Sequence, residues 1–407
     1  MENNVKTIPF WTDNVPAPAM YPWLDHNENC DVAVIGSGIA GVLCALKFAE
    51  GGVRTVLVGD EPVGYGSTGA SPGVISYQLE GGINALADKI GFENAVAVYR
   101  LCAEGVETVS GLCGDLGDDA GYAKADCLYY TTSEKKRQKI HQEYLTRSHN
   151  GFDVEFLDEN NAGALFSFPI KGGVLSRGLA AVVDPYRLTC ALAQKARALG
   201  AMIFENTHIV SVDDSNAGTA LHTAHGKTIT AKKTILAAGS ESAEHLGMYA
   251  DVRTAFHVVT APVPDFSGWY GPAALVSDGA PDIRLRTTPD MRIMISGLES
   301  GLAGVRKLSG LLPVESLKGK KYAELVGLLI SMFPGIRDIR AEYQFASDYI
   351  RTCDKLPVIG QIENSSIYHC LCTGENGIAF AAVAARMLLD LWGGAPPEEL
   401  ALFSPLR

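Results

Sequence analysis

Three glycines near the N-terminus have the spacing of a nucleotide-binding turn. Residues 32–35 predict a short apolar strand, and Gly36, Gly38 and Gly41 follow it as G-x-G-x-x-G before a helix expected over 42–50. The first glycine permits a tight turn, the second lets the backbone approach a pyrophosphate, and the third lets helix and strand pack closely. The helix N-terminus then offers unpaired N–H groups and a positive dipole end to the phosphates. An ordinary strand–helix turn with chance glycines is the alternative. The residues predicted to contact a dinucleotide here are Gly36, Gly38, Ile39, Ala40 and Gly41.

The end of the second expected strand, over 55–58, is where an acidic residue normally binds an adenosine ribose. Gly59 occupies that position, and Asp60 comes one residue later. Asp60 is therefore a candidate for the ribose hydroxyls, and a solvated turn aspartate is the competing interpretation.

Two further segments end in small residues that would allow close backbone approach to a ligand. A predicted strand that starts at Thr234 ends at Ala238 and Gly239. Near the C-terminus, Gly374 to Ile378 lead into an apolar helix, so a second helix N-terminus could direct N–H groups at an anion or a polarised carbonyl. A plain glycine-rich helix cap is the alternative for the latter.

The order of these motifs resembles the FAD-dependent D-amino acid oxidase and glycine oxidase superfamily over nearly the full chain. Besides the segments above, the resemblance includes Gly66 to Ser71, Val183-Asp184-Pro185, Thr352-x-Asp354-x-x-Pro357-x-x-Gly360, and an aromatic leader over 10–24 that is similar to the one in putrescine-oxidase-like members. It implies FAD held without a covalent bond. It adds as cofactor-binding residues Gly66, Ser67, Thr68, Ser71, Ile209, Ala238, Gly239, Gly374, Asn376, Gly377 and Ile378, with Ile209 at the adenine.

The fold class that the resemblance implies is α/β (α+β). It combines a Rossmann-type FAD-binding domain of the glutathione-reductase-like, D-amino acid oxidase type with an antiparallel-sheet substrate domain. We expect an N-terminal arm over 1–29 and a discontinuous FAD-binding domain over 30–80, 151–250 and 341–407. The substrate domain then covers 81–150 and 251–340. The length of 407 residues is consistent with two domains.

The chemistry implied is oxidation of the C–N bond of an amino acid or amine, with hydride transfer to the flavin N5. Amino-acid-oxidising members carry a carboxylate-binding arginine five residues before the aspartate that matches Asp354, and Tyr349 stands there. Arg351 lies two residues further on, on the same strand face, and could serve as the clamp or pair with an aspartate. Arg286 matches a frequent arginine of the substrate domain, and Arg284 is its neighbour on that face. The residues predicted to be catalytic are Arg351, Tyr349 and Arg286.

Other readings stay open. Within the same superfamily the substrate could be a 2-hydroxy acid, or the chain could be a flavin-binding electron-transfer subunit of a heteromeric dehydrogenase. Oxygen, a quinone or a protein carrier would accept the electrons, since no second dinucleotide motif suggests NAD(P)H. Trp269, Tyr270 and His257 are candidate pocket residues, although core aromatics are the simpler interpretation.

Composition narrows the partners. A formal net charge of −12 argues against nucleic acid. Nine scattered cysteines without a C-x-x-C pair favour a reduced, cytoplasmic protein with free thiols and no metal site. Cys370 and Cys372 are expected as buried core thiols. The longest apolar stretch, over 378–392, contains Arg386 and Asp390, so no membrane span is predicted. Homo-oligomers or a partner subunit remain possible.

Simple patterns predict several elements. Residues 81–150 look helical, a helix over 186–199 follows Asp184-Pro185, and 221–236 read as a hairpin around His225-Gly226. Several strands are expected over 252–300, and a helix over 322–332. The aromatics of the N-terminal arm are expected to pack on the body of the protein.

Overall fold

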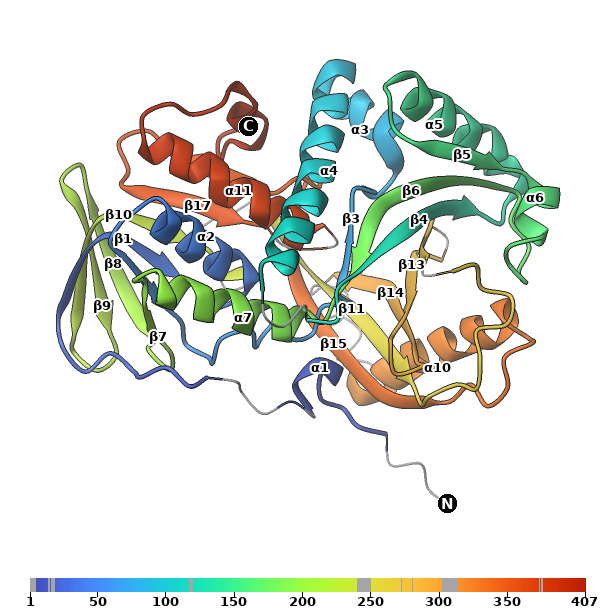
Figure 1. Ribbon diagram of the computed structural model, residues 1–407, viewed down its shortest axis with the longest axis horizontal. Helices are drawn as coiled ribbons and strands as arrows, with labels where there is room; N and C mark the ends of the chain where they lie inside the picture. Colours follow the sequence, from blue (N-terminus) through green and yellow to red (C-terminus); the bar gives the residue numbers. More distant parts are fainter. Residues whose placement is uncertain are drawn as a thin grey trace.

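The computed structural model contains two large sheets that lie side by side, each with its own helices (Figure 1). The structure describes residues 5–13, 15, 19–116, 120–239, 250–271, 273–279, 281–301, 314–372, 374 and 376–407. The expected α/β class is confirmed, with one mainly parallel and one mainly antiparallel sheet.

The eight-stranded sheet has a parallel centre. Its strands are ordered β16-β17-β10-β1-β2-β7, and the hairpin β8–β9 joins it through β9. Neighbours from β17 to β7 run parallel, whereas β16 and β9 are antiparallel to theirs. The strands are β1 (Glu28–Ile35), β2 (Thr55–Val58), β7 (Met202–Phe204), β8 (Ile209–Ser215), β9 (Gly218–Thr223), β10 (Thr228–Leu236), β16 (Val358–Gln361) and β17 (Ile367–Leu371).

The nine-stranded sheet is ordered β15-β11-β14-β13-β12-β4-β6-β3, with β5 added beside β6. All of its pairs are antiparallel except β12 with β4. Its strands are β3 (Val74–Ser76), β4 (Ala123–Thr131), β5 (Val154–Leu157), β6 (Gly172–Val182), β11 (Ala250–Thr260), β12 (Ala274–Ser277), β13 (Ile283–Thr287), β14 (Ile293–Gly301) and β15 (Ala341–Thr352).

Helices cover the outer parts of both sheets. In Figure 1, α2, α7 and α11 lie on the eight-stranded sheet, while α5 and α10 lie on the nine-stranded one. The bounds are α1 (Phe10–Asp13), α2 (Ile39–Glu50), α3 (Gly82–Ile90), α4 (Phe92–Gly114), α5 (Arg137–His149), α6 (Glu159–Gly163), α7 (Pro185–Ala198), α10 (Val314–Met332) and α11 (Gly377–Trp392), with short 3₁₀ turns over Glu134–Lys136 and Glu398–Phe403. Among the described helices, none has both the length and the apolar character needed to cross a membrane.

Two main apolar cores correspond to the two sheets. The larger one contains α2, α4, α7 and α11, and the second lies between α10 and the strands of the nine-stranded sheet. Trp269 belongs to the second core and stacks on Phe333 at 4.7 Å, so its interpretation as a core aromatic is confirmed. Cys370 and Cys372 are buried as expected, and the Cys370 sulfur lies 3.5 Å from the Cys44 sulfur.

The N-terminal arm is attached to both sheets. The backbone of Lys6 bonds with residues of β15, and the buried indole of Trp11 donates to the Ser71 carbonyl at 2.8 Å. Further along, the buried carboxylate of Glu205 accepts hydrogen bonds from the backbone N–H groups of Tyr21 (3.0 Å) and Val63 (2.7 Å). The expected packing of the arm's aromatics is therefore confirmed for Trp11 and Tyr21. Residues 1–4, 14 and 16–18 of the arm lie outside the described residues.

Local patterns predicted most elements, and the differences arise from strand pairing. The hairpin, the helix after Asp184 and the strands after residue 250 are present. The helical interpretation of 81–150 is wrong for β4, which is held as a strand by pairing with β6 and β12. The ranges expected for the FAD-binding domain also contain β3, β5, β6 and β15, although all four pair in the nine-stranded sheet.

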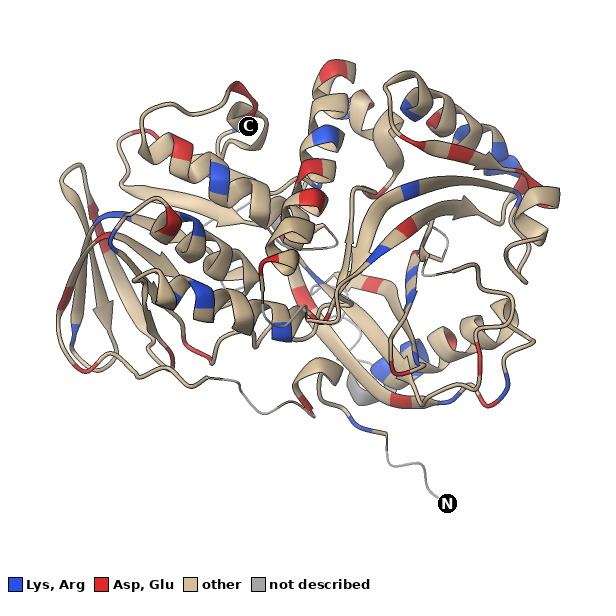
Figure 2. Cartoon of the chain, in the orientation of Figure 1, with Lys and Arg blue, Asp and Glu red and all other residues tan. Residues whose placement is uncertain are grey.

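Charged residues of both signs are interspersed over the face shown in Figure 2. Three consecutive cationic residues, Lys135 to Arg137, lie at the start of α5. Lys136 approaches Asp278 at 3.3 Å and Arg137 approaches Glu134 at 3.8 Å, so two of the three are paired within the protein.

Candidate functional site

A cavity runs from the glycine turn of the eight-stranded sheet to one face of the nine-stranded sheet. The space between its walls amounts to about 1620 Å³, a figure that includes its open mouth. Predicted cofactor residues that line it are Gly36, Gly38, Ile39, Ala40, Asp60, Gly66, Ser67, Thr68, Ser71, Ala238, Gly239, Gly374, Gly377 and Ile378.

The first end of the cavity is formed by the glycine turn between β1 and α2. Gly36 has φ +122°, a conformation that side chains rarely adopt, and a Cβ there would overlap the Ala237 carbonyl. A Cβ at Gly41 would overlap the Gly36 carbonyl oxygen, so Gly41 does not line the cavity but lets α2 start directly against the turn. Gly38 is the N-cap residue and has no side chain to satisfy the first N–H groups of α2. These features fit a pyrophosphate.

The ribose candidate Asp60 lines the cavity, beside Glu61. Its carboxylate also lies 2.6 Å from the exposed His208 ring, so an internal partner competes with a ribose hydroxyl for it. Ile209 follows His208 at the start of β8 and is not among the residues that line the cavity. Its expected adenine contact stays a prediction.

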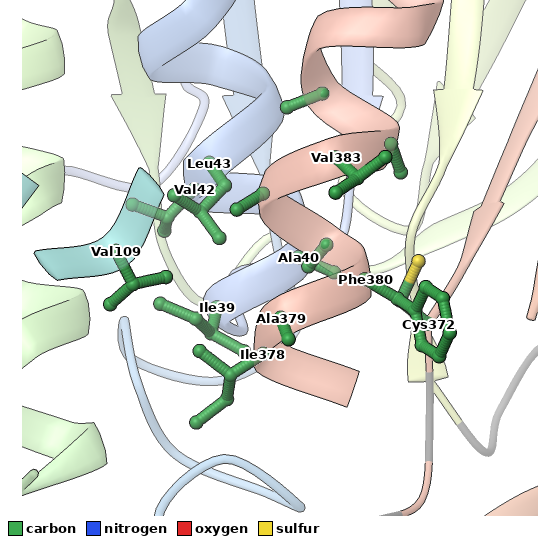
Figure 3. Close-up of a cluster of buried hydrophobic side chains, with 14 of the residues drawn as sticks. Ile39, Ala40, Val42, Leu43, Val109, Cys372, Ile378, Ala379, Phe380 and Val383 are labelled. Atoms are coloured by element: carbon green, nitrogen blue, oxygen red, sulfur yellow. The ribbon is translucent and has the colours of Figure 1, made fainter. Parts of the chain in front are cut away.

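Two helix N-termini meet at the cavity. Figure 3 shows Ile39 of α2 next to Ile378 of α11, with Ala40 and Ala379 between the two helices. Their dipoles therefore add positive potential to the same region. Asn376, which precedes α11, does not line the cavity; its amide donates to the carbonyls of Ser76 (2.6 Å) and Gln78 (3.1 Å). Thr373 and Glu375 of this segment lie outside the described residues.

The loop over 64–73 forms one wall, and Thr68 fixes it to α2. The Thr68 hydroxyl accepts the Ile39 N–H at 3.0 Å. Arg286 holds the end of the loop because its Nη1 donates to the carbonyls of Gly73 (2.7 Å), Val183 (2.8 Å) and Pro72 (3.2 Å). Arg286 is 1% exposed and does not line the cavity. The structure therefore places Arg286 among backbone carbonyls and outside the cavity lining, which favours a positioning role over the predicted catalytic one.

The nine-stranded sheet closes the other end with polar side chains. His257 of β11 pairs in register with Ser296 of β14, which pairs with Arg284 of β13, and all three line the cavity. The His257 ring is 2.8 Å from the hydroxyls of both Ser296 and Ser347. Burial lowers the pKa of His257 to about 3, so the imidazole is neutral at physiological pH. These hydrogen bonds fix the hydroxyl groups of Ser296 and Ser347 at the cavity wall.

Carboxyl groups stand beside this polar row. Asp282, Glu299 and Asp348 line the cavity, and burial raises the pKa of both Asp282 and Glu299. Tyr349 lines it as predicted and hydrogen-bonds to Glu299, and burial raises the pKa of its phenol, which therefore stays protonated. A buried carboxyl with a raised pKa is a better proton acceptor than an exposed one.

Arg351 faces a smaller adjoining cavity that shares Tyr349 and Gly374 with the main one. Its Nη2 contacts both carboxylate oxygens of Glu80, at 2.5 and 2.6 Å, and its Nη1 lies 3.2 Å from Glu299. The predicted clamp is therefore already paired inside the protein. Arg284, the alternative weighed from the sequence, is the arginine among the described residues that line the main cavity.

Several lining residues were missed by the sequence analysis, namely Glu61, Asp282, Ser296, Glu299 and Ser347. Ser347 stands two residues before Tyr349 on β15, so alternation along that strand could have found it. Ser296 and Glu299 of β14 are three residues apart, with Leu298 at φ +52° between them, so alternation does not find both. Tyr270, a candidate of that analysis, instead accepts a hydrogen bond from Arg177 at 2.6 Å and is not a lining residue.

A family model described as FAD dependent oxidoreductase (DAO) matches residues 31–391. Glycine oxidase of Bacillus licheniformis is 26% identical over 395 residues, which cover 90% of this chain and 94% of that protein. Gamma-glutamylputrescine oxidoreductase of Escherichia coli (strain K12) is 21% identical over 384 residues, 92% of this chain and 86% of that protein. The solved structure of glycine oxidase from Geobacillus kaustophilus has a TM-score of 0.75 at 19% identity and covers 94% of this chain and 99% of that one.

The chain belongs to the DAO family of FAD dependent oxidoreductases. It is an enzyme, and FAD is its cofactor. The glycine turn and the two helix N-termini at the cavity fit this cofactor, and the fold is that of the glycine oxidase structure.

Proposed function

We propose that this enzyme oxidises the C–N bond of an amine or amino acid. The observation that carries the proposal is a single cavity that joins the glycine turn to a wall of ionisable side chains on the nine-stranded sheet. The names of two relatives, glycine oxidase and gamma-glutamylputrescine oxidoreductase, support the same substrate class. Bound FAD supplies the hydride acceptor at its N5 position.

The protein's own residues prepare the substrate. An ammonium group has no free electron pair, so a proton must leave the nitrogen before its carbon can release a hydride. Asp282 and Glu299 are the candidate acceptors, because both line the cavity and burial raises the pKa of each. The hydroxyls of Ser296 and Ser347, held by neutral His257, can orient the nitrogen through hydrogen bonds.

The N-terminus of α11 contributes electrostatically. Gly377 and Ile378 line the cavity, so the positive end of the helix dipole faces the cofactor site. This end stabilises negative charge that develops there during the reaction.

The test is anaerobic mixing of the purified FAD-loaded enzyme with amines, amino acids and 2-hydroxy acids, followed by flavin absorbance. Loss of the flavin band with amines or amino acids supports the proposal. Loss only with hydroxy acids replaces it with the competing reaction of the superfamily. No loss with any compound, despite bound flavin, favours an electron-transfer subunit. Admission of oxygen afterwards distinguishes an oxidase from a dehydrogenase.

A pair of variants tests the proton acceptor. Glu299→Gln removes a carboxyl group that lines the cavity, and we expect flavin reduction about 10²-fold slower, the low end for loss of general base catalysis. Glu104→Gln is the matched control because Glu104 also pairs with an arginine, Arg386 at 3.0 Å, on the exposed face of α4. Equal rates in both variants would remove Glu299 from the proton transfer.

A further inference from the structure

The charged side chains around the substrate end of the cavity determine which amines can bind there. Arg351 lines the smaller cavity, and its guanidinium is already bound by two carboxylates. Nη2 contacts both oxygens of Glu80, and Nη1 contacts Glu299. A guanidinium that is paired on both sides offers little to a further carboxylate.

Glu80 is itself held in place. It lies before α3, and its Oε1 is 2.5 Å from the Lys355 ammonium as well as from Arg351. Its side chain is 25% exposed, so this cluster is only partly open to solvent. Glu80 thus occupies Nη2 of Arg351 with a carboxylate of the protein, while Glu299 occupies Nη1, so the two nitrogens that a substrate carboxylate would need for a bidentate pair are already engaged.

The side chains that line the main cavity also favour a cationic substrate over one with a carboxylate. Asp282, Glu299 and Asp348 line its substrate end, against Arg284 as the described lining cation. A substrate carboxylate would enter a region where carboxyl groups outnumber cations. Arg284, the cation there, already interacts electrostatically with Asp282. A positively charged amine meets the opposite situation, since these groups attract it.

We propose that the site selects amines that carry no carboxylate on the reacting carbon, and that Glu80 is a specificity-determining residue because it neutralises Arg351. This inference rests on the proposed oxidation of a C–N bond and names the substrate class of that same site. Glu80 acts through Arg351, so its removal should change which substrates bind, with amino acids gaining relative to simple amines.

The test uses substrate pairs that differ only by that carboxylate, namely propylamine with α-aminobutyrate, and agmatine with arginine. Each is mixed anaerobically with the FAD-loaded enzyme at equal concentration, and the rate of flavin reduction is measured. We expect the amine of each pair to react at least tenfold faster. In Glu80→Gln the ratio should narrow at least tenfold because the amino acid reacts faster, whereas Glu104→Gln should leave it unchanged.

The possible failures are distinguishable. If the amino acid of each pair reacts as fast as the amine in the unmodified enzyme, the selectivity inference is overturned while C–N oxidation stands. If neither member reduces the flavin, the proposed function falls and the inference falls with it. An unchanged ratio in a folded, FAD-loaded Glu80→Gln enzyme removes Glu80 from the inference. The comparison in the unmodified enzyme needs no variant, so it decides the substrate class even if Glu80→Gln does not fold.

Discussion

Arg286→Ala should destabilise the protein and release FAD rather than slow the chemistry. Its guanidinium is 1% exposed and bonds to the carbonyls of Gly73 and Val183 at 2.7 and 2.8 Å, with a longer bond to Pro72. Hydrogen bonds from a charged donor contribute about 1.5–3 kcal/mol each. Since the variant leaves buried carbonyls without this donor, we expect a loss of about 3–5 kcal/mol of unfolding free energy.

The assay for Arg286→Ala combines urea unfolding with the flavin content after gel filtration. The flavin should be lost because the loop that Arg286 holds lines the cofactor cavity. Arg284→Ala is the matched control, two residues away on the same strand face, and should retain more stability and flavin. If Arg286→Ala unfolds like the unmodified enzyme, keeps its flavin and yet loses turnover, the positioning role is refuted and a catalytic one returns.

Three other predictions follow from single contacts. Gly38→Val should abolish FAD binding, since a Cβ there lies 3.0 Å from the Thr68 hydroxyl at the pyrophosphate turn; retained yellow flavin would contradict it. Burial lowers the pKa of His257 from 6.5 to about 3, so its contribution to the free energy of unfolding is complete above about pH 6.5 and is lost as the pH falls toward 3. A plot of unfolding free energy against pH should therefore be flatter between pH 6.5 and 3 for His257→Phe than for the unmodified enzyme. Parallel plots would count against this prediction. Native alkylation followed by mass spectrometry should label the exposed Cys353 and spare the buried Cys44, and the opposite order would mean that the core around α2 opens readily.

The ion pair between Glu80 and Arg351 shows that a tertiary contact can change the role expected of a residue from its sequence position. From the sequence, Arg351 was a candidate clamp because it stands on the same strand face as Tyr349. That strand reasoning is local and correct, and both residues do belong to β15. The partner, however, comes from a loop 271 positions earlier in the chain, which no local pattern reveals.

Arg284 and Arg286 illustrate the same division. Their spacing placed both on one face of one strand, as the structure has them. Which of the two reaches the cavity depends on where the loop over 64–73 and the end of β6 approach β13, and these contacts leave Arg286 enclosed and Arg284 facing the cavity. Likewise, the polar wall on β14 and β15 exists as a wall only after the strands pair in register.

The sequence alone determined the cofactor half of this protein. Glycine spacing, an apolar strand and a following helix specify a nucleotide turn through backbone geometry and the helix N-terminus, which are local properties of about twenty residues. The tertiary structure decided the substrate half, because that wall is assembled from strands far apart in the chain, as with Ser296 and Ser347 around His257. Burial and ion pairing, which set the charge and pKa of those side chains, depend on neighbours that only the folded chain brings together.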